Sequence, residues 1–366
     1  MSDENGIAII FQGALKPLEK VVYQLPKKIE PDEILVKISL STVCGSDLHT
    51  WLGQRPFPTH CILGHEIVGK IVNIGEKIKK DYAQNKLSVG DRITWSMTVG
   101  CNDCFFCNIG LPQKCHQMFK YGHVTSKDYP HFTGGFAQYI ILKKNTYIFK
   151  IPNTLSDAEV APLMCAGATV TSGLSTSHFQ PCDFVVIQGV GALGLYACAF
   201  TKQLGAKTVI AIDVVDERLE LAKQFGADFL ININSNTDPI KEVLKITSGR
   251  GADFVIEMTG DPTVVKQGIE MLRIGGKYVL LGAIYPDSNI TIDVSQIMLK
   301  CIEIYGMHNY HPTNLKKAIE LVDDSKRKFP YEKLVGPSFQ LSVKGVEDAL
   351  ASLNSKKSIR PAIIDK

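Results

Sequence analysis

In the first third of the chain, hydrophobic residues alternate with polar ones over short runs. Between about Asp32 and Gly135 these runs read ILVKISLS, EIVGKIVNIG and DRITW, and Gly, Pro and Asn turns separate them. Alternation with a period of two residues, with little helical periodicity, is typical of β-strands. The pattern predicts an irregular β-rich domain in this part of the chain.

A different pattern begins near Ser156 and becomes regular after Pro181. In SDAEVAPLMCAGAT, Ser156 is followed three residues later by Glu159, which predicts a helix start. Beyond Pro181, strand-like DFVVIQG and TVIAIDV alternate with helix-like ALGLYACAFTKQLG and DERLELAKQFG, and further strands are expected at ADFLIN, ADFVIEMTG and KYVLLGA. This alternation predicts a parallel sheet with crossover helices, so the fold class is α/β. After about Gly306 the pattern is less regular, and the sequence alone does not show which domain the tail joins.

Length and composition narrow the function classes. With 366 residues the chain exceeds one comfortable hydrophobic core and fits two domains. Its charged fraction of 21% is ordinary and its net charge of +3 is spread along the chain, so we expect no nucleic-acid partner. The start, MSDENG, is acidic where a signal peptide would be basic, and the most apolar stretch, 184–200, is shorter than the roughly 20 residues that span a bilayer. We expect a cytoplasmic location without a membrane segment.

A glycine-rich turn joins the first strand after Pro181 to the helix that follows it. The residues Gly189-Val-Gly191-Ala-Leu-Gly194 form G-x-G-x-x-G between a strand and a helix. The first glycine permits the turn, the second lets the backbone approach a pyrophosphate, and the third lets the helix pack on the strand. The turn predicts a dinucleotide site, although the same motif also occurs in turns that bind nothing.

Asp213 indicates which of the two dinucleotides, NAD or NADP, the site prefers. It ends the next strand, VIAID, about 20 residues after the turn, where a carboxylate can accept hydrogen bonds from an adenosine ribose. A phosphate on that ribose would be repelled by this charge, so the sequence predicts NAD rather than NADP.

Four of the ten cysteines cluster in CNDCFFCNIGLPQKC, at Cys101, Cys104, Cys107 and Cys115. In a reducing compartment such clustering favours metal binding over disulfides. Four thiolates close a tetrahedral ion and leave no position for substrate, so the loop predicts a structural zinc site. An iron–sulfur cluster or a redox disulfide pair are the alternatives.

A catalytic metal therefore needs ligands from elsewhere in the chain. Cys44 lies in CGSDLH, His65 and Glu66 lie in GHE, and Cys165 lies in MCAGAT. Each is weak evidence alone, because a single cysteine is most often a small buried hydrophobe.

Taken together, these motifs resemble a known family. CGSDLH, LGHEIVG, the four-cysteine loop, CAGATV, GVGALG and Asp213 occur in the order found in the zinc-dependent medium-chain alcohol dehydrogenases, and the resemblance covers nearly the whole chain. It implies a GroES-like catalytic domain, residues 1–166 and 306–366, and a Rossmann NAD-binding domain, residues 167–305. It also implies two zinc ions per chain. The catalytic zinc would be bound by Cys44, His65 and Cys165, with Glu66 as an alternate or neighbouring ligand, and the structural zinc by the four-cysteine loop.

The resemblance further implies a reaction and its proton path. Hydride would pass between an alcohol, of secondary or polyol type, and NAD, giving an aldehyde or ketone. Ser46 would contact the substrate oxygen and relay its proton through the cofactor ribose, His49 would pass it to water, and Asp47 would orient His65. Arg360 would contact the cofactor pyrophosphate and Arg218 would lie beside the adenosine ribose. Members of the family form dimers and tetramers, so we expect a homo-oligomer.

Some features lie outside the common pattern. The segments 79–88 and 120–135 are unexplained, and the second carries His123 and His131. The stretches WLGQRPFPTHCILGHE and LPQKCHQMFKYGH also resemble a subgroup found with phosphonate-degradation genes, in which Arg55 would meet an anionic substrate. Two other functions compete: a zinc-free quinone reductase, disfavoured by the presence of Cys44, His65 and Cys165, and a zinc- and nucleotide-binding redox sensor without turnover.

Overall fold

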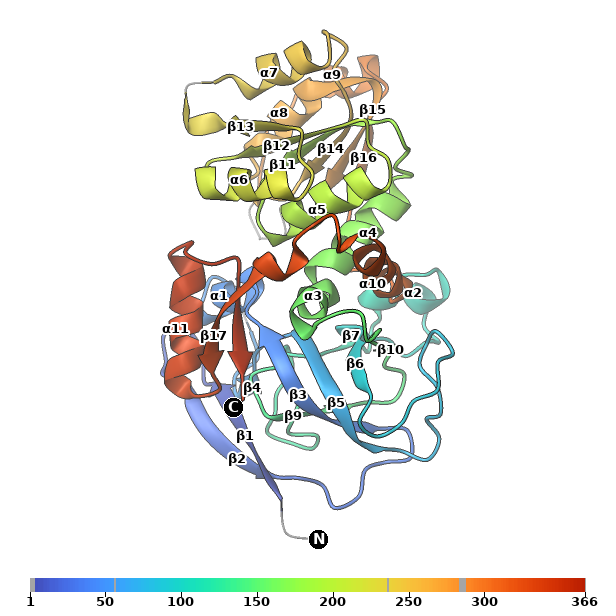
Figure 1. Cartoon of the computed structure of the whole chain (residues 1–366), viewed down its shortest axis with the longest axis vertical. Helices are drawn as coiled ribbons and strands as arrows, with labels where there is room; N and C mark the ends of the chain where they lie inside the picture. Colours follow the sequence, from blue (N-terminus) through green and yellow to red (C-terminus); the bar gives the residue numbers. More distant parts are fainter. Residues whose placement is uncertain (1–3, 56, 236, 283–287, 366) are drawn as a thin grey trace. The chain divides into compact units, whose positions relative to one another are not determined.

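The computed structural model describes residues 4–55, 57–235, 237–282 and 288–365, and the chain divides into two compact units (Figure 1). The first unit comprises Met1–Cys165, His311–Asp323 and Tyr331–Lys366, and the second comprises Ala166–Tyr310 and Asp324–Pro330. A short segment after residue 323 thus returns to the second unit before the tail joins the first.

The first unit is β-rich, and the residues of the candidate site adjoin strands of its largest sheet. This seven-stranded sheet has the order β10-β6-β5-β3-β18-β17, and β9 also pairs with β3. Its members are β3 (Ile34–Thr42), β5 (Glu66–Ile74), β6 (Arg92–Trp95), β9 (Tyr139–Leu142), β10 (Ile148–Lys150), β17 (Val335–Gln340) and β18 (Arg360–Ile364). Two smaller sheets are β2-β1-β4 and β7-β8, formed by β1 (Asn5–Phe11), β2 (Glu19–Gln24), β4 (Cys61–Ile62), β7 (Thr98–Val99) and β8 (Phe119–Lys120).

The C-terminal tail completes this sheet. β18 pairs antiparallel with β3, with Ala362 opposite Thr42, so the red end of the chain lies beside the blue β3 in Figure 1. Helix α11 (Val343–Asn354) places Val346, Ala349 and Leu350 in the same hydrophobic core as β1 and β3. Their spacing of three and four residues puts them on one helical face, which is why the tail is held against the first unit.

The remaining helical segments of the first unit are short, apart from α10. They are α1 (Gly45–Trp51), α2 (Phe105–Asn108), η1 (Pro112–Lys114), α3 (Asp157–Val160), η2 (Ala161–Met164), α10 (Thr313–Ser325) and η4 (Tyr331–Leu334). The predicted helix start is present, because Ser156 Oγ accepts from the backbone N–H of Glu159 and the Glu159 carboxylate accepts from the backbone N–H of Ser156. The α-helix lasts one turn and continues as the 3₁₀ segment η2, in which Pro162 has no N–H to donate.

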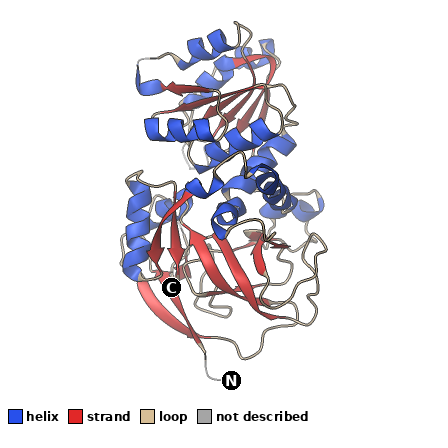
Figure 2. Cartoon of the chain, viewed as in Figure 1, coloured by secondary structure: helices blue, strands red, loops and turns tan. Residues whose placement is uncertain are grey.

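The second unit is a six-stranded parallel sheet with helices around it (Figure 2). Its strand order is β13-β12-β11-β14-β15-β16, the arrangement of the Rossmann fold. The strands are β11 (Phe184–Gln188), β12 (Thr208–Asp213), β13 (Phe229–Asn232), β14 (Ala252–Glu257), β15 (Leu272–Leu280) and β16 (Glu303–Gly306). The helical segments are α4 (Ala166–Thr176), α5 (Ala192–Gln203), α6 (Asp216–Gln224), η3 (Ile233–Ser235), α7 (Pro239–Ile246), α8 (Val264–Met271) and α9 (Val294–Leu299).

The two architectures confirm the predicted α/β fold class. None of the helices in the described ranges is both long and apolar enough to cross a membrane.

Candidate active site

Strand register brings two of the predicted metal ligands together. β3 and β5 are antiparallel with Thr42 opposite Glu66, so the chain just after β3 runs alongside the chain just before β5. Cys44 follows β3 and is the N-cap residue of α1, and His65 immediately precedes β5. The pairing of β3 with β5 therefore brings Cys44 and His65 together, although their spacing in the sequence gives no sign that they meet.

Cys165 arrives from a third segment. It directly follows η2, which packs against β3 and β5. One ligand atom from each of Cys44, His65 and Cys165 lies within 4.8 Å of the others, and the first two residues are buried. Two thiolates and an imidazole in this arrangement fit a zinc ion and leave one coordination position for a substrate oxygen.

Asp47 fixes the orientation of His65. Its Oδ1 lies 3.2 Å from His65 Nδ1 and accepts from the backbone N–H of Gly64, while its Oδ2 accepts from the backbone N–H of Cys44 at 2.9 Å. Asp47 and His65 are each 1% exposed. Because Nδ1 faces a carboxylate, Nε2 is the nitrogen left for a metal.

Arg360 and Glu66 form a buried ion pair beside Cys44. Arg360 Nε lies 2.9 Å from Glu66 Oε2, and Thr42 Oγ1 donates to the same oxygen at 2.5 Å. Arg360 also reaches Cys44 Sγ at 3.6 Å. Among the described residues, the three-ligand cluster does not include Glu66, whose carboxylate is engaged by Arg360 and Thr42. Direct ligation by Glu66, like the pyrophosphate contact of Arg360, stays a prediction.

These neighbours favour the thiolate form of Cys44. The Cys165 thiol and the Arg360 guanidinium hold the pKa of Cys44 well below its ordinary value, although burial opposes them. A thiolate is the form that binds metal.

Ser46 and His49 lie on α1, one turn apart. Ser46 Oγ is 3.3 Å from His65 Nε2, at the edge of the metal cluster. His49 is half-buried, and its Nδ1 is hydrogen-bonded to Gln54 Oε1. Residues i and i+3 of a helix share a face, so both side chains lie on the same side of α1, and their roles in a proton path stay predictions.

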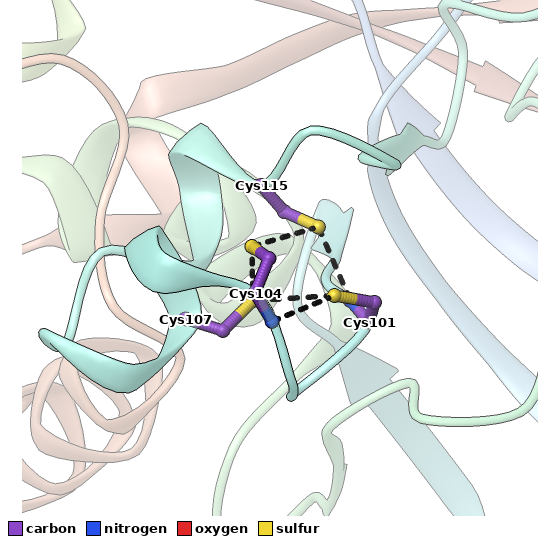
Figure 3. A group of neighbouring side chains, drawn as sticks. All are labelled: Cys101, Cys104, Cys107 and Cys115. Atoms are coloured by element: carbon purple, nitrogen blue, oxygen red, sulfur yellow. Dashed lines mark hydrogen bonds between the residues drawn. The ribbon is translucent and has the colours of Figure 1, made fainter.

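The four-cysteine loop forms a second cluster (Figure 3). The sulfur atoms of Cys104 and Cys107 are 3.6 Å apart, those of Cys104 and Cys115 are 3.8 Å apart, and those of Cys101 and Cys107 are 4.0 Å apart. A tetrahedron with Zn–S bonds of about 2.3 Å has sulfur atoms about 3.8 Å apart, so these positions fit one zinc ion. The backbone N–H groups of Cys107 and His116 lower the pKa of the Cys104 thiol to about 6, which favours the ligand form.

The glycine-rich turn has the geometry of a phosphate cradle. Gly189 has φ of +89°, and a Cβ on Gly194 would lie 2.1 Å from the carbonyl oxygen of Gly189. A Cβ on Gly191 would meet no atom within 4 Å, so this side of the turn is open. β11 also lies between β12 and β14, where the strand order reverses and dinucleotides bind in this fold.

Asp213 lies against this turn. Its Oδ2 accepts from the backbone N–H of Val190 at 2.8 Å, and its Oδ1 accepts from the N–H groups of Val214 and Val215. Arg218 lies on the first half of α6 and is half-buried; within the part of the chain that is described, no hydrogen bond or ion pair engages its side chain. The carboxylate is thus held at the turn, and the ribose contacts of both residues stay predictions.

The two unexplained segments differ in position. Residues 79–88 form a turn, which is closed by an isolated antiparallel β-bridge between the backbones of Lys80 and Lys86. In the segment 120–135, His131 stacks on Tyr23 with ring centroids 4.5 Å apart, whereas the ring of His123 lies 5.0 Å from that of His65.

Three residues at the site belong to no motif that marks them as functional: Thr42, Thr50, whose Oγ1 accepts from Arg55 Nε at 2.8 Å, and Lys120. Lys120 ends β8 and lies within electrostatic range of Cys165, Arg55 and Cys44, and burial lowers its pKa. A single lysine in a two-residue strand carries no sequence signal of such a position.

A Rossmann sheet with an open glycine turn, in one chain with a thiolate–imidazole cluster, defines a class of protein: the metal-dependent oxidoreductases that use a dinucleotide. Two protein-family models match this chain, one over its first part and one over the part that contains most of the parallel sheet. Residues 30–153 match the alcohol dehydrogenase GroES-like domain, and residues 192–324 match the zinc-binding dehydrogenase domain.

Known proteins are similar over most of their length. An alcohol dehydrogenase of Geobacillus stearothermophilus is 31% identical over 327 residues, 88% of this chain and 90% of the relative. The crystal structure of an alcohol dehydrogenase from Thermotoga maritima matches with a TM-score of 0.93 at 29% identity, covering 99% of this chain and 100% of the other. Benzyl alcohol dehydrogenase from Acinetobacter calcoaceticus matches with a TM-score of 0.84 at 30% identity, covering 99% and 100%. The chain belongs to the zinc-dependent medium-chain alcohol dehydrogenase family, which confirms the resemblance found in the sequence.

Proposed function

We propose that this protein is an NAD-dependent zinc alcohol dehydrogenase that interconverts an alcohol, of secondary or polyol type, and its aldehyde or ketone. The observation that carries the proposal is the Cys44–His65–Cys165 cluster with the Ser46 hydroxyl at its edge. In the oxidation, the alcohol carbon gives a hydride to NAD⁺ and the hydroxyl loses a proton, so the products are a carbonyl compound, NADH and H⁺.

The bound metal would polarise the substrate oxygen and stabilise negative charge on it. The protein's own residues then transfer the proton of the substrate hydroxyl to water. Ser46 accepts it from the substrate hydroxyl, and His49, which is half-buried on the same helix, passes it to water. Asp47 keeps His65 in one orientation throughout, because its carboxylate is held by two backbone N–H groups.

The nicotinamide cofactor supplies the hydride chemistry. We propose that its pyrophosphate lies at Gly189–Gly194, where the Gly191 side of the turn is open, and that Asp213 favours NAD over NADP. Arg360 and Arg218 are proposed to contact the pyrophosphate and the ribose, respectively.

We also propose that the protein assembles as a homodimer or homotetramer. β16 is an edge strand of the parallel sheet, and exposed apolar side chains gather on it and on α9. They are Ile304, Val294, Met298 and Leu299, with exposures of 40%, 58%, 72% and 77%. Light scattering on the wild type and on Leu299→Glu would check this proposal, because a monomeric wild type contradicts it.

The test of the function combines metal analysis with turnover. Purified protein should contain two zinc ions per chain and should form NADH from NAD⁺ with members of a broad alcohol panel. One zinc per chain and no turnover on the whole panel would overturn the proposal and favour the redox-sensor alternative.

A further inference from the structure

A pair of cations lies beside the metal cluster and has no role in the proton path. Arg55 Nε donates to Thr50 Oγ1 at 2.8 Å, and Arg55 Nη2 lies 3.2 Å from His123 Nε2. The guanidinium carbon also lies 5.2 Å from the centre of the Phe57 ring. The Arg55 side chain is therefore held in one place by several contacts rather than extended into solvent.

The partners of Arg55 are uncharged. His123 Nδ1 lies 3.0 Å from the backbone carbonyl oxygen of Tyr121, which can only accept a hydrogen bond, so Nδ1 carries the proton. His123 Nε2 then accepts from Arg55, and the imidazole is neutral. Hydrogen bonds to an imidazole and to the Thr50 hydroxyl orient Arg55 without neutralising its charge.

Lys120 is the second cation. It lies at the end of β8, opposite Thr98, and it is half-buried. Its electrostatic neighbours are Cys165, Arg55, Cys44 and Asp47, which places both cations on the metal-cluster side of the first unit. Over the ranges that the structure describes, neither Arg55 nor Lys120 forms an ion pair with a carboxylate.

This arrangement leaves positive charge beside the site. Removing a charge from water without a partner is costly, so charges of this kind are normally paired. The thiolates of Cys44 and Cys165 would neutralise the divalent ion that they would hold, so they are not free to pair with these cations. Asp47 lies within electrostatic range of Lys120, but its oxygens face His65 and accept from the backbone N–H groups of Cys44 and Gly64. A bound ligand can therefore bring negative charge into direct contact with both cations.

We propose that the alcohol substrate carries an oxyanion, a carboxylate or a phosphate-type group, a few bonds from its hydroxyl carbon, and that Arg55 and Lys120 receive it. The inference rests on the proposed function, since it concerns the substrate of the same site. His123 contacts Arg55 and its ring lies 5.0 Å from that of His65, so the guanidinium is one side chain away from the metal cluster. The Arg55 guanidinium matches two oxygens of such a group, and Lys120 adds a point charge. Both are specificity-determining residues.

The experiment uses zinc-loaded enzyme, NAD⁺ and pairs of alcohols that differ in charge. 3-Hydroxybutyrate is compared with its methyl ester, and glycerol 3-phosphate with glycerol, which separates a carboxylate from a phosphate. In each pair that is turned over, kcat/KM should favour the charged member. Arg55→Met and Lys120→Met should each reduce that preference by about 10- to 100-fold, the effect of one lost charge-assisted hydrogen bond. Lys127→Met, which removes an exposed lysine of the neighbouring loop, should leave the preference unchanged.

Calorimetric binding of butyrate and of inorganic phosphate gives a readout apart from turnover. One of the two anions should bind the zinc-loaded wild type and Lys127→Met but bind Arg55→Met at least tenfold more weakly. Equal preference for charged and neutral alcohols, or anion binding that Arg55→Met leaves intact, would overturn the inference while the enzyme still oxidises neutral alcohols. Anion binding that depends on Arg55, together with no turnover of any alcohol, would support the anion site and refute the proposed function.

Discussion

The buried ion pair between Arg360 and Glu66 gives a sharp stability prediction. The change is Arg360→Met, which keeps an unbranched side chain and removes the charge. Glu66 is fully buried and would retain only the hydrogen bond from Thr42 Oγ1. The variant therefore leaves a carboxylate in the protein interior without its cation.

The expected loss is large because both charges are desolvated. Arg360 is 5% exposed, and two Nε–Oε distances, 2.9 and 3.1 Å, describe a close pair. Two charges about 4 Å apart interact with about 4 kcal/mol at an effective dielectric constant of about 20. Removing one partner of such a pair costs about 3–5 kcal/mol of unfolding free energy, which corresponds to about 10 °C in the transition of a unit of this size.

Differential scanning calorimetry of zinc-loaded protein measures this shift, with zinc content determined for each variant. The control is Lys344→Met, which breaks an exposed pair with Asp348 on α11 of the same unit and should cost less than about 1 kcal/mol. Adding Glu66→Gln to Arg360→Met should restore much of the loss, because it removes the unpaired charge. The reasoning is refuted if Arg360→Met shifts the transition no more than Lys344→Met, or if Glu66→Gln deepens the loss.

Three further predictions concern the metals, the cofactor and the parallel sheet. Cys44→Ser should abolish turnover with a nearly unchanged thermal transition, whereas Cys104→Ser should lower stability or solubility first; a fully stable and merely inactive Cys104→Ser would contradict the division of roles. Asp213→Ala should lower kcat/KM for NAD about tenfold more than for NADP, and equal losses would count against the ribose contact. Asp253 is bound by Arg250 and Arg273, and these contacts lower its pKa although burial opposes them, so the folded state binds fewer protons than the unfolded state. The stabilisation is present above about pH 4 and is lost as acid protonates Asp253, so in urea unfolding the deficit of Asp253→Asn should shrink toward pH 3.

The parts of the fold that local patterns determine were predictable from the sequence. Alternating strands and helices after Pro181 gave the parallel sheet, and the motif at Gly189 gave its phosphate turn, because both signals lie within a few consecutive residues. The four-cysteine loop belongs to the same group, since its fifteen residues contain all four ligands.

The catalytic cluster could not be derived that way. Cys44, His65 and Cys165 meet because of the β3–β5 register and the packing of η2, and the sequence connected them only through a family resemblance. Lys120 begins the segment 120–135, which the sequence left unexplained, and nothing in that segment marked the lysine as part of the site. Its position depends on β8 pairing with β7, and strand pairs of two residues leave no periodicity to detect.

The return of the tail to β3 sets an order of events during synthesis. Arg360 meets Glu66 across 294 positions of sequence, and the whole parallel sheet is translated between them. The nascent chain therefore exposes Cys44, His65 and Glu66 long before Arg360 leaves the ribosome, and contacts of such separation form late. Formation of the Arg360–Glu66 pair thus reports that the full chain has folded, and a chain cut before β18 would present the thiols of Cys44 and Cys165 without the arginine that pairs with Glu66.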